Sequence, residues 1–498
     1  MTDPSSPSSN NNNHKHDATQ QSDTMVDETG GGGPVKEVPP VAGDSLMMMS
    51  HEGGSSSWKA TAIVALVIAV IVVLSAGITA SKRNNNNDDD DDASDKSKDL
   101  IATWIPHDAP AITPEWETTD SSIPSFRHFD VDDKNLVVAG LTEDHTAQLE
   151  WYMWMEHTST QPNSNVTKTS SWWQHQATLP LGDLNPESHP TVHVQGNVVV
   201  VADAQSVPKE QEGLIAPSES YHGLVRVYTL QPGSTDIPTL PAIVLTHQGA
   251  QDDLWGNAVD LDTAASHLVV GAPLTDAPSA LHAGSLHIYD LNKDATVADA
   301  DESAFPFVQV GSALPGTHAF DGIGGAGLAI SGDGRTVAAG VPLDSLTVAS
   351  AGAIRLWRWD DETNDWTKGE TIIGAHAGMG LGRRVQLNED GTILVATTML
   401  TNQVVVYDYS CDYDTTPACQ WVRKGQFLEG TAAHLQGVRL AVVNDGAVRV
   451  YQWSAQYLVW VKAGQAALPG VAAQLTDNAQ RMIIQTEQGS LQTWQWVS

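Results

Sequence analysis

The only two cysteines of the chain are spaced so that they could form a disulfide. Cys411 and Cys419 flank the stretch DYDTTPA, directly after an alternating aromatic run. A hairpin at this point would bring their Cα atoms within the ~4.4 to 6.8 Å that a disulfide requires. Because disulfides persist mainly in secreted, lumenal and cell-surface proteins, the pair predicts an oxidising compartment for this part of the chain. Two free thiols are the alternative.

Asn165 is a second residue with distinctive chemistry. It begins the sequence Asn-Val-Thr, an acceptor for N-linked glycosylation, and it lies in a polar stretch before SWWQHQ. We predict an exposed loop at Asn165 that faces the lumen or the cell exterior.

One strand-like motif recurs through the chain and must position these residues. DGAVRVYQW, at 445–453, alternates apolar and polar residues, which is the period of a half-buried β-strand. The Asn-Asp-Gly at its start favours a tight hairpin turn. The motif occurs six more times, as QLEWYMW, GLVRVYTL, GSLHIYDL, GAIRLWRW, NQVVVYDY and GSLQTWQW.

The strands around each copy indicate a four-stranded antiparallel unit. An apolar strand such as HLVVGAP from His267 precedes each copy, and a run such as WTKGETIIG from Trp366 usually follows it. The later copies are spaced like the ~40 to 50 residues of a propeller blade, and the earlier ones require loop insertions. We therefore predict an all-β, seven-bladed β-propeller over residues 101–498, with two packed β-domains as the competing fold. The aromatic anchors of the seven units are Tyr152, Tyr228, Tyr289, Trp357, Tyr407, Tyr451 and Trp494.

The seventh unit is one strand short, since the chain given stops at Ser498 directly after its third strand. Propeller rings avoid an open sheet edge by taking the missing strand from the other end of the domain. Ala102–Pro106, or the following stretch to about Trp116, is expected to supply it.

Three segments resemble the FG-GAP repeat, which builds the propeller in the head of integrin α chains and in many membrane-tethered proteins of microbial eukaryotes. They are LWGNAVDLDTAASHLVVGAP at 254–273, IGGAGLAISGDGRTVAAGVP at 323–342 and MGLGRRVQLNEDGTILVATT at 379–398. The resemblance covers the third to fifth units well and is diffuse in the others. It implies a propeller that acts as a binding module, and it carries over no catalytic residue.

The resemblance also directs attention to a calcium site. Calcium-binding FG-GAP loops resemble D-x-[DN]-x-D-G-x-x-D, and DLNKDATVAD at 290–299 places Asp290, Asn292 and Asp294 at ligand spacing. Ala295 replaces the glycine, however, and the last acid is one position late. Calcium is thus a candidate ligand of this loop, and a solvated hairpin loop is the alternative.

No residue pattern for catalysis is present in the predicted propeller. It contains no His-rich metal spacing, Gly-x-Ser-x-Gly or phosphate-binding loop. SGDGRTV from Ser331 lacks the spacing and tryptophan of sialidase-like Asp boxes, and turn geometry explains it better. His318 and His376 occupy equivalent positions before two units. Loops there would share one rim, where the two histidines would contact a ligand or cap turns.

Two classes of function follow from these observations. The first is a recognition module whose rim loops bind a protein or a glycan, without catalytic residues or a cofactor. The second is a hydrolase or lyase with its active site near the central channel. A cluster of carboxylates with perturbed pKa values, or a metal in the channel, would favour the second.

The N-terminal hundred residues differ from the rest in composition. We expect a disordered tail at 1–59, which is rich in Ser, Asn, Gly and Pro, and an extended Asn/Asp-rich linker at 81–100. Between them, residues 60–80 contain no charge and are long enough to cross the bilayer as a single transmembrane helix. A buried core helix and a cleaved signal peptide are the alternatives.

Charge bears on partners and on topology. Residues 101–498 hold 45 acidic and 18 basic residues, a net charge near −27, which disfavours binding to nucleic acid.

The positive-inside rule compares Lys59 with Lys82 and Arg83 and mildly favours a cytoplasmic propeller. The cysteine pair, Asn165 and the resemblance of the span to a signal anchor oppose it. We predict a single-pass protein with a cytoplasmic tail and an extracellular or lumenal propeller.

Overall fold

A computed structural model gives the fold of the chain after residue 102. The predicted tail, transmembrane helix and linker lie outside the described residues. The described residues contain no helix that is long and apolar enough to cross a membrane. They are 103–112, 127–141, 147–160, 167–181, 190–204, 223–230, 243–245, 253–294, 307–325, 327–411, 419–464 and 467–497.

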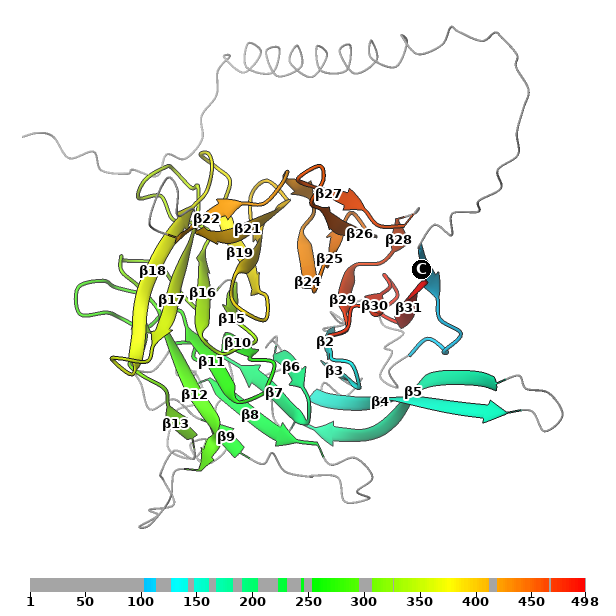
Figure 1. The fold of residues 1–498 in the computed structure, drawn as a ribbon. Helices are drawn as coiled ribbons and strands as arrows, with labels where there is room; N and C mark the ends of the chain where they lie inside the picture. Colours follow the sequence, from blue (N-terminus) through cyan, green and yellow to red (C-terminus); the bar gives the residue numbers. More distant parts are fainter. Residues whose placement is uncertain are drawn as a thin grey trace, which may run out of the picture. The chain divides into compact units, whose positions relative to one another are not determined.

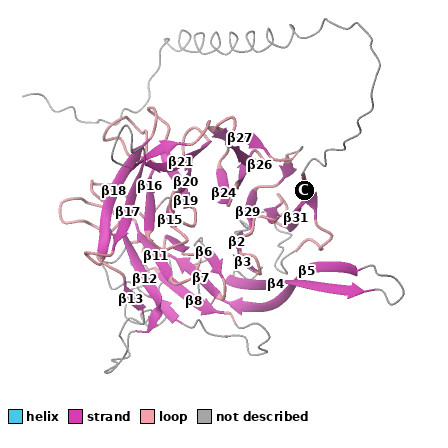
Figure 2. Ribbon diagram, viewed as in Figure 1, coloured by secondary structure: helices cyan, strands magenta, loops and turns pink. Residues whose placement is uncertain are grey.

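Seven antiparallel sheets follow one another around a ring, so the prediction of a seven-bladed β-propeller is confirmed (Figure 1). Figure 2 shows that strands and short loops make up the described chain. Blade 1 contains β2 (Arg127–Val131), β3 (Asn135–Leu141), β4 (Ala147–Thr160) and β5 (Thr167–Pro180), and blade 2 contains β6 (Thr191–Gln195), β7 (Val198–Asp203), β8 (Leu224–Thr229) and β9 (Ile243–Leu245). Blade 3 contains β10 (Ala258–Leu261), β11 (His267–Ala272), β12 (Ser285–Asp294) and β13 (Phe307–Gln309), and blade 4 contains β15 (Leu328–Ile330), β16 (Thr336–Val341), β17 (Ala353–Asp360) and β18 (Asp365–Ile373).

The remaining blades repeat this order with one exception. Blade 5 contains β19 (Leu381–Leu387), β20 (Ile393–Thr398), β21 (Gln403–Cys411) and β22 (Cys419–Arg423), and blade 6 contains β24 (Ala432–Gln436), β25 (Arg439–Asn444), β26 (Ala447–Ser454) and β27 (Val459–Lys462). Blade 7 is built from β29 (Ala472–Leu475), β30 (Arg481–Gln485), β31 (Leu491–Val497) and the N-terminal strand β1 (Thr103–Pro106). Three short strands pair with the third strands of blades 3, 5 and 6: β14 (Leu314–Pro315), β23 (Leu428–Glu429) and β28 (Leu468–Pro469).

The strand β1 closes the ring, as predicted from the missing seventh-unit strand. It pairs antiparallel with β31, with Trp104 opposite Trp496, and the two indole rings pack edge to face at 5.4 Å between centroids. Ile112 extends the contact through a further bridge to Leu491. The last blade is therefore held by residues from both ends of the domain.

Aromatic anchors of the repeat pack between blades. Tyr228 of blade 2 lies in one buried cluster with Val137 and Leu149 of blade 1. Tyr152 of blade 1 shares a cluster with Ile483 of blade 7. A buried aromatic side chain removes roughly 150–250 Å² from water, so these anchors supply much of the cohesion between sheets.

Glycine pairs form the seams between the blades that resemble one another most. A Cβ atom on Gly271 would lie 2.5 Å from the Cα of Gly324 in the next blade, and one on Gly340 would lie 1.8 Å from the carbonyl oxygen of Gly382. Gly324 and Gly382 also have φ values of +85° and +103°, which L side chains rarely adopt. The glycines of the repeat thus allow the backbones of blades 3, 4 and 5 to touch.

The closing strand gives the first testable prediction. Trp104 is 7% exposed within the cluster of blades 6 and 7. Trp104→Ala should lower the free energy of unfolding by about 3–5 kcal/mol, because it leaves a cavity under the strand that closes the ring. Urea denaturation of the purified chain measures this change.

The matched control is Trp104→Phe. It keeps an aromatic ring and removes the Nε1–H donor, which has no hydrogen-bond acceptor among the described residues. We expect a loss below about 2 kcal/mol. An equal loss in both variants, or none in Trp104→Ala, would contradict a closing role for this side chain.

Candidate functional site

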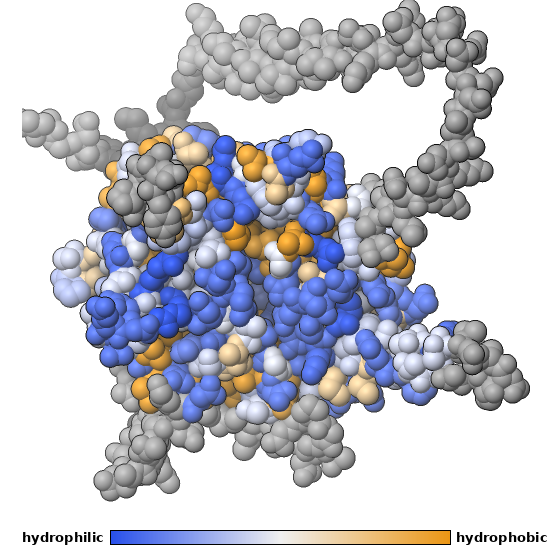
Figure 3. Space-filling view, in the orientation of Figure 1, coloured by the Kyte–Doolittle hydropathy of each residue, from blue (hydrophilic) through white to orange (hydrophobic). Residues whose placement is uncertain are grey.

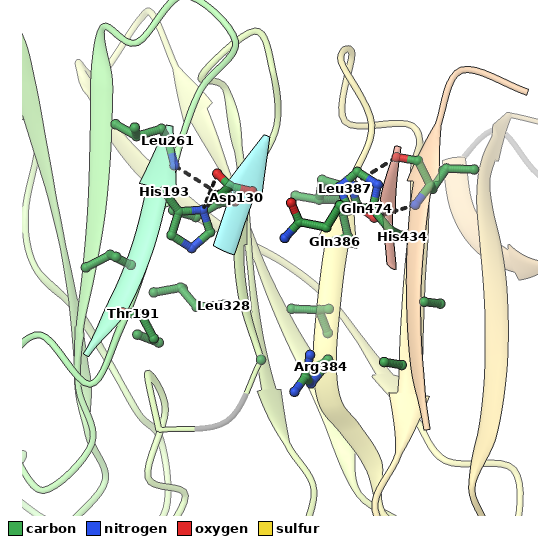
Figure 4. A pocket seen from close by; sticks show the side chains of 18 of the residues that line it. Asp130, Thr191, His193, Leu261, Leu328, Arg384, Gln386, Leu387, His434 and Gln474 are labelled. Atoms are coloured by element: carbon green, nitrogen blue, oxygen red, sulfur yellow. Dashed lines mark hydrogen bonds and ion pairs between the residues drawn. The ribbon is translucent and has the colours of Figure 1, made fainter. Parts of the chain in front are cut away.

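The first strands of the seven blades surround a central cavity of about 1050 Å³. These strands are β2, β6, β10, β15, β19, β24 and β29. Figure 3 shows mostly hydrophilic residues around the centre of the ring, and Figure 4 shows side chains from opposite walls of the cavity. The inner strands present their edges to the cavity, so consecutive residues such as His128–Val131 line it, while their side chains alternate between the two neighbouring blades.

Seven side chains at one level of the ring, six of them polar and lining the cavity, are called the inner ring. Its members occupy equivalent register positions, each opposite the same position of the second strand of its blade. The inner ring consists of Asp130, His193, Asp260, Ala329, Gln386, His434 and Gln474.

The acidic members of the inner ring bind the backbone of the next blade. Asp130 Oδ2 accepts a hydrogen bond from Val194 N at 2.7 Å, and Asp260 Oδ2 accepts one from Ile330 N at 2.9 Å. Inner strands of neighbouring blades are not paired with each other in a sheet, so these amides depend on side chains as acceptors. The carboxylates therefore join successive blades.

The amide and imidazole members act in the same way on the facing wall. Gln386 accepts from Leu435 N at 2.7 Å and donates to Leu435 O at 3.0 Å. His434 Nδ1 accepts from Leu475 N at 3.1 Å, and Gln474 donates to Phe129 O at 3.0 Å. The last of these bonds links blade 7 to blade 1 and completes the circuit.

Ala329 is the one apolar member of the inner ring. It is buried and packs in a cluster with Leu381, Leu387 and other residues of blade 5. At this seam, apolar packing takes the place of a side-chain hydrogen bond.

His193 lies between the two carboxylates of the ring. Its Nδ1 is 3.7 Å from Asp130 Oδ2 and 3.6 Å from Asp260 Oδ1 (Figure 4 shows the contact with Asp130). Burial raises the pKa of Asp130 to about 7 and that of Asp260 to about 6, and it lowers the pKa of His193. Burial and, to a lesser extent, the charge of His193 also lower the pKa of His434 to about 4.

These shifts match one feature expected of an enzyme, namely perturbed carboxylates in the central channel. The carboxylates also have a structural role, because each accepts a backbone hydrogen bond across a seam. Among the described residues, no group of three or more His, Cys, Asp and Glu side chains could hold a metal ion.

A second candidate site is the rim of blades 3 to 5, formed by five connecting segments at 273–284, 316–327, 342–352, 374–380 and 399–402. In a four-stranded blade, the connection from the second to the third strand and the connection to the next blade leave the same edge. Six large apolar side chains on these segments are exposed: Phe320 (69%), Leu343 (63%), Leu346 (58%), Leu400 (54%), Leu281 (51%) and Met399 (44%). We call them the apolar rim patch.

A buried ion cluster holds two of these segments in place. Arg355 of β17 is only 6% exposed. Its Nη2 donates to Asp344 Oδ2 at 2.7 Å and contacts Asp321 Oδ1 at 3.3 Å. Asp344 follows Leu343, and Asp321 follows Phe320. The guanidinium thus ties together two segments that carry patch residues.

Backbone hydrogen bonds connect the other segments. Phe320 N donates to Leu281 O at 2.8 Å, Gly378 N to Ala349 O at 3.0 Å, and Met399 N to Gly380 O at 2.7 Å. Hydrogen bonds thus join the connecting segments that carry the apolar rim patch. This reduces the entropy of ordering these segments, which a binding partner would otherwise have to offset.

Phe320 also adopts an unusual backbone conformation. Its φ of +64° lies in the left-handed region, which costs a non-glycine residue roughly 1–3 kcal/mol. The aromatic ring is nevertheless exposed, beside His282 at 5.8 Å between ring centroids. The ring is therefore accessible to a partner.

The structure places the predicted site residues as follows. Cys411 and Cys419 are opposite each other in β21 and β22 and are joined by a disulfide, with Cα atoms 4.0 Å apart. His318 lies on the rim, half exposed, with Nδ1 2.9 Å from Thr317 Oγ1. His376 lies on the same rim, with Nδ1 3.1 Å from Ala377 O. Asn165 lies outside the described residues, in the segment that joins β4 to β5.

The candidate calcium ligands lie on a strand rather than in a loop. Asp290, Asn292 and Asp294 all belong to β12, where alternate residues are roughly 6–7 Å apart. Asp290 is buried, and its Oδ1 accepts a hydrogen bond from Asn292 N. The strand β12 therefore continues through the first half of the stretch 290–299, and residues 295–299 lie outside the described residues.

Sequence reasoning missed the inner ring and the apolar rim patch. The ring left a signal, a polar residue between two apolar ones in the first strand, as with His193 in TVHVQ and Asp260 in AVDL. The patch left none, because its residues lie outside any periodic pattern.

Comparison with known proteins adds similarity in fold alone. No protein-family model matches the chain, and no characterised protein matches it in sequence. One similar solved structure is a chain of a mitotic checkpoint complex, with 12% identity, a TM-score of 0.44, and coverage of 83% of this chain and 99% of that one. Another is the β-propeller domain of Cps50 (Swd1) from Myceliophteria thermophila, with 11% identity, a TM-score of 0.41, and coverage of 73% and 94%. Such distant similarities carry no argument about what this chain binds.

The raised pKa of Asp130 makes a prediction about stability and pH. A carboxyl group whose pKa is higher in the folded state stabilises that state below its unfolded pKa, and this contribution is lost as pH rises through the folded value. The loss therefore falls between about pH 4 and pH 7. Asp130→Asn keeps an acceptor for Val194 N but does not ionise, so it should gain stability relative to the native chain as pH rises from 5 to 8.

Thermal unfolding of the two proteins at several pH values measures this difference. His193 has the opposite pH dependence, because its pKa is lowered, but it is present in both proteins and largely cancels. Parallel pH profiles for the two proteins would contradict a buried Asp130 carboxyl with a raised pKa.

Proposed function

We propose that this chain is a membrane-anchored recognition module whose apolar rim patch binds a partner protein. The observation that carries the proposal is the exposure of six large apolar side chains on one rim of blades 3 to 5, where hydrogen bonds join the connecting segments. Exposed apolar groups gathered at one place on a soluble domain mark interaction sites more often than isolated ones do. A protein is favoured over a glycan because aliphatic side chains predominate in the patch.

Charge defines the partner further. With a net charge near −27 for residues 101–498, the propeller repels acidic partners over a long range. The partner segment should therefore combine apolar side chains, which bury the patch, with Lys or Arg residues around them.

The anchor and the compartment belong to the same proposal. Residues 60–80 would cross the membrane once, with the tail at 1–59 in the cytoplasm and the propeller in the lumen or outside the cell. The disulfide between Cys411 and Cys419 and the acceptor sequence at Asn165 support this side. The glycine seams of blades 3 to 5 support kinship with membrane-tethered FG-GAP propellers.

A hydrolase or lyase that acts in the central channel is the second candidate. Asp130 and Asp260, with their raised pKa values beside His193, are the observation in its favour. Turnover of a substrate that is abolished by Asp260→Asn, with the fold intact, would establish it.

The patch gives a prediction in which stability and binding change in opposite directions. Phe320→Gly relieves the positive φ, so the variant should be at least as stable as the native chain. It also removes the most exposed aromatic of the patch, so partner affinity should fall by roughly 30-fold, the scale of a binding hot spot. Proximity labelling on intact cells, followed by binding of the purified partner, measures this loss.

Leu458→Gly is the matched control. Leu458 has a φ of +53° and is 67% exposed, but it lies in the turn between β26 and β27, away from the patch. The same proteins should be labelled by the native chain and by Leu458→Gly, and lost with Phe320→Gly. An unchanged set of labelled proteins with Phe320→Gly would rule out the patch as the binding site.

Topology is tested separately. Protease added to intact cells should remove the propeller and leave the tail at 1–59 attached to the membrane. Cys411 and Cys419 should be alkylated only after reduction. Protection of the propeller, together with alkylation of both cysteines without reduction, would reverse the assigned sides.

A further inference from the structure

Two consecutive arginines of β19 line the central cavity. Arg383 and Arg384 both contribute to its wall, and Figure 4 shows Arg384 across the cavity from Thr191. Their pairing with β20 is irregular, because the register shifts between Leu381 and Arg384. Such a bulge adds a residue to the strand and bends it locally, and bulges commonly re-aim side chains next to functional sites.

The other blades carry no comparable charge at this level of the cavity. The positions equivalent to Arg384 lie two residues before the inner ring, and most hold small side chains. They are His128, Thr191, Ala258, Gly327, Ala432 and Ala472. Blade 5 thus places a cation at a level of the channel where most other blades have small side chains.

Neither guanidinium has a counter-ion among the described residues. The ion pairs of arginine in the described chain join Arg335 to Asp361 and Arg355 to Asp321 and Asp344. Burial lowers the pKa of Arg384, and the neighbouring charge of Arg383 lowers it further, but an arginine remains protonated at neutral pH. In a domain with a net charge near −27, two adjacent cations without an acid are left for an anion from outside.

The rest of the cavity limits what that anion is. Asp130 and Asp260 of the inner ring would repel a dianion such as phosphate whenever they are ionised. His434 Nδ1 accepts from the backbone, so its Nε2 carries the proton and offers a neutral donor. A planar carboxylate matches the fork of a guanidinium, and hydroxyl groups would suit the polar ring.

We propose that the central channel binds a small hydroxylated carboxylate, a sugar acid either free or at the end of a glycan, through the guanidinium of Arg384 with Arg383 beside it. The two arginines are not part of the apolar rim patch, although Met399 belongs to the patch and also lines the cavity, and binding here requires no catalysis. The cavity reaches this rim at Pro342 and Met399 and the opposite edge at Gln195 and Gln436.

Calorimetry of the purified full-length chain with glucuronate tests the proposal. Saturable binding is expected, with a loss of tenfold or more in affinity in Arg384→Ala. This variant gives blade 5 the alanine that blade 3 has at the equivalent position, Ala258. The midpoint of thermal unfolding should therefore stay close to that of the native chain. Arg384→Lys should retain part of the affinity, because it keeps the charge and loses the fork.

Four comparisons separate the alternatives. Arg423→Ala removes the same charge from the exposed outer strand of blade 5 and should leave glucuronate affinity unchanged. Glucose should not bind, and an oligosaccharide ending in glucuronate should bind if the source is a glycan and fail if only free acids fit. Binding of phosphate in preference to glucuronate, equal binding of glucose, or full affinity in Arg384→Ala would each overturn the proposal. None of these results depends on the rim partner.

Discussion

The pairing of β1 with β31 is the contact on which the rest of the structure depends. Each inner strand pairs only with the second strand of its own blade, so its other neighbours are the adjacent blades of the ring. Without β1, blade 7 would have three strands, and β31 would present a row of unpaired backbone groups at an open edge. Thr103 and Val497 lie at opposite ends of the propeller sequence, and their pairing fixes both ends at once. The closure therefore sets the curvature that brings seven inner strands around one channel.

Closure of the propeller leaves backbone groups of the inner strands without a partner strand, and side chains of the inner ring bind them. The inner strands have backbone amides that face a neighbouring blade without a partner strand, and such groups must be satisfied. Asp130, Asp260, Gln386 and His434 supply the acceptors. The same burial that makes these bonds effective raises the pKa of the two carboxyl groups. Blade cohesion and perturbed acidity thus have one physical cause, and the perturbed carboxylates of this channel do not by themselves indicate catalysis.

The sequence predicted what periodicity and strand number determine. Seven alternating motifs, with one strand missing from the last, were enough for the number of blades and for the closing role of Ala102–Pro106. The motif also led to the disulfide partners, because Cys411 and Cys419 end and begin successive strands. Two kinds of feature could not be predicted. Arg383 and Arg384 line the cavity at a bulge of β19, and a bulge cannot be foreseen from the alternation of residues along a strand. The apolar rim patch depends on hydrogen bonds between connecting segments that are far apart in sequence.

The apolar rim patch and the arginine pair both fall on blades 3 to 5, and the seams of these blades explain why. Where Gly271 meets Gly324 and Gly340 meets Gly382, the backbones of adjacent blades touch, and the loops above them can bond to each other directly. Close, regular seams make a rigid platform on which exposed or strained side chains such as Phe320 can be held. The same closeness leaves the repeat no room for large residues at the channel level in blades 3 and 4, where Ala258 and Gly327 stand. Only in blade 5, where the register shifts, does the chain place arginines there, so the departure from the repeat, rather than the repeat itself, supplies the charge that a ligand would need.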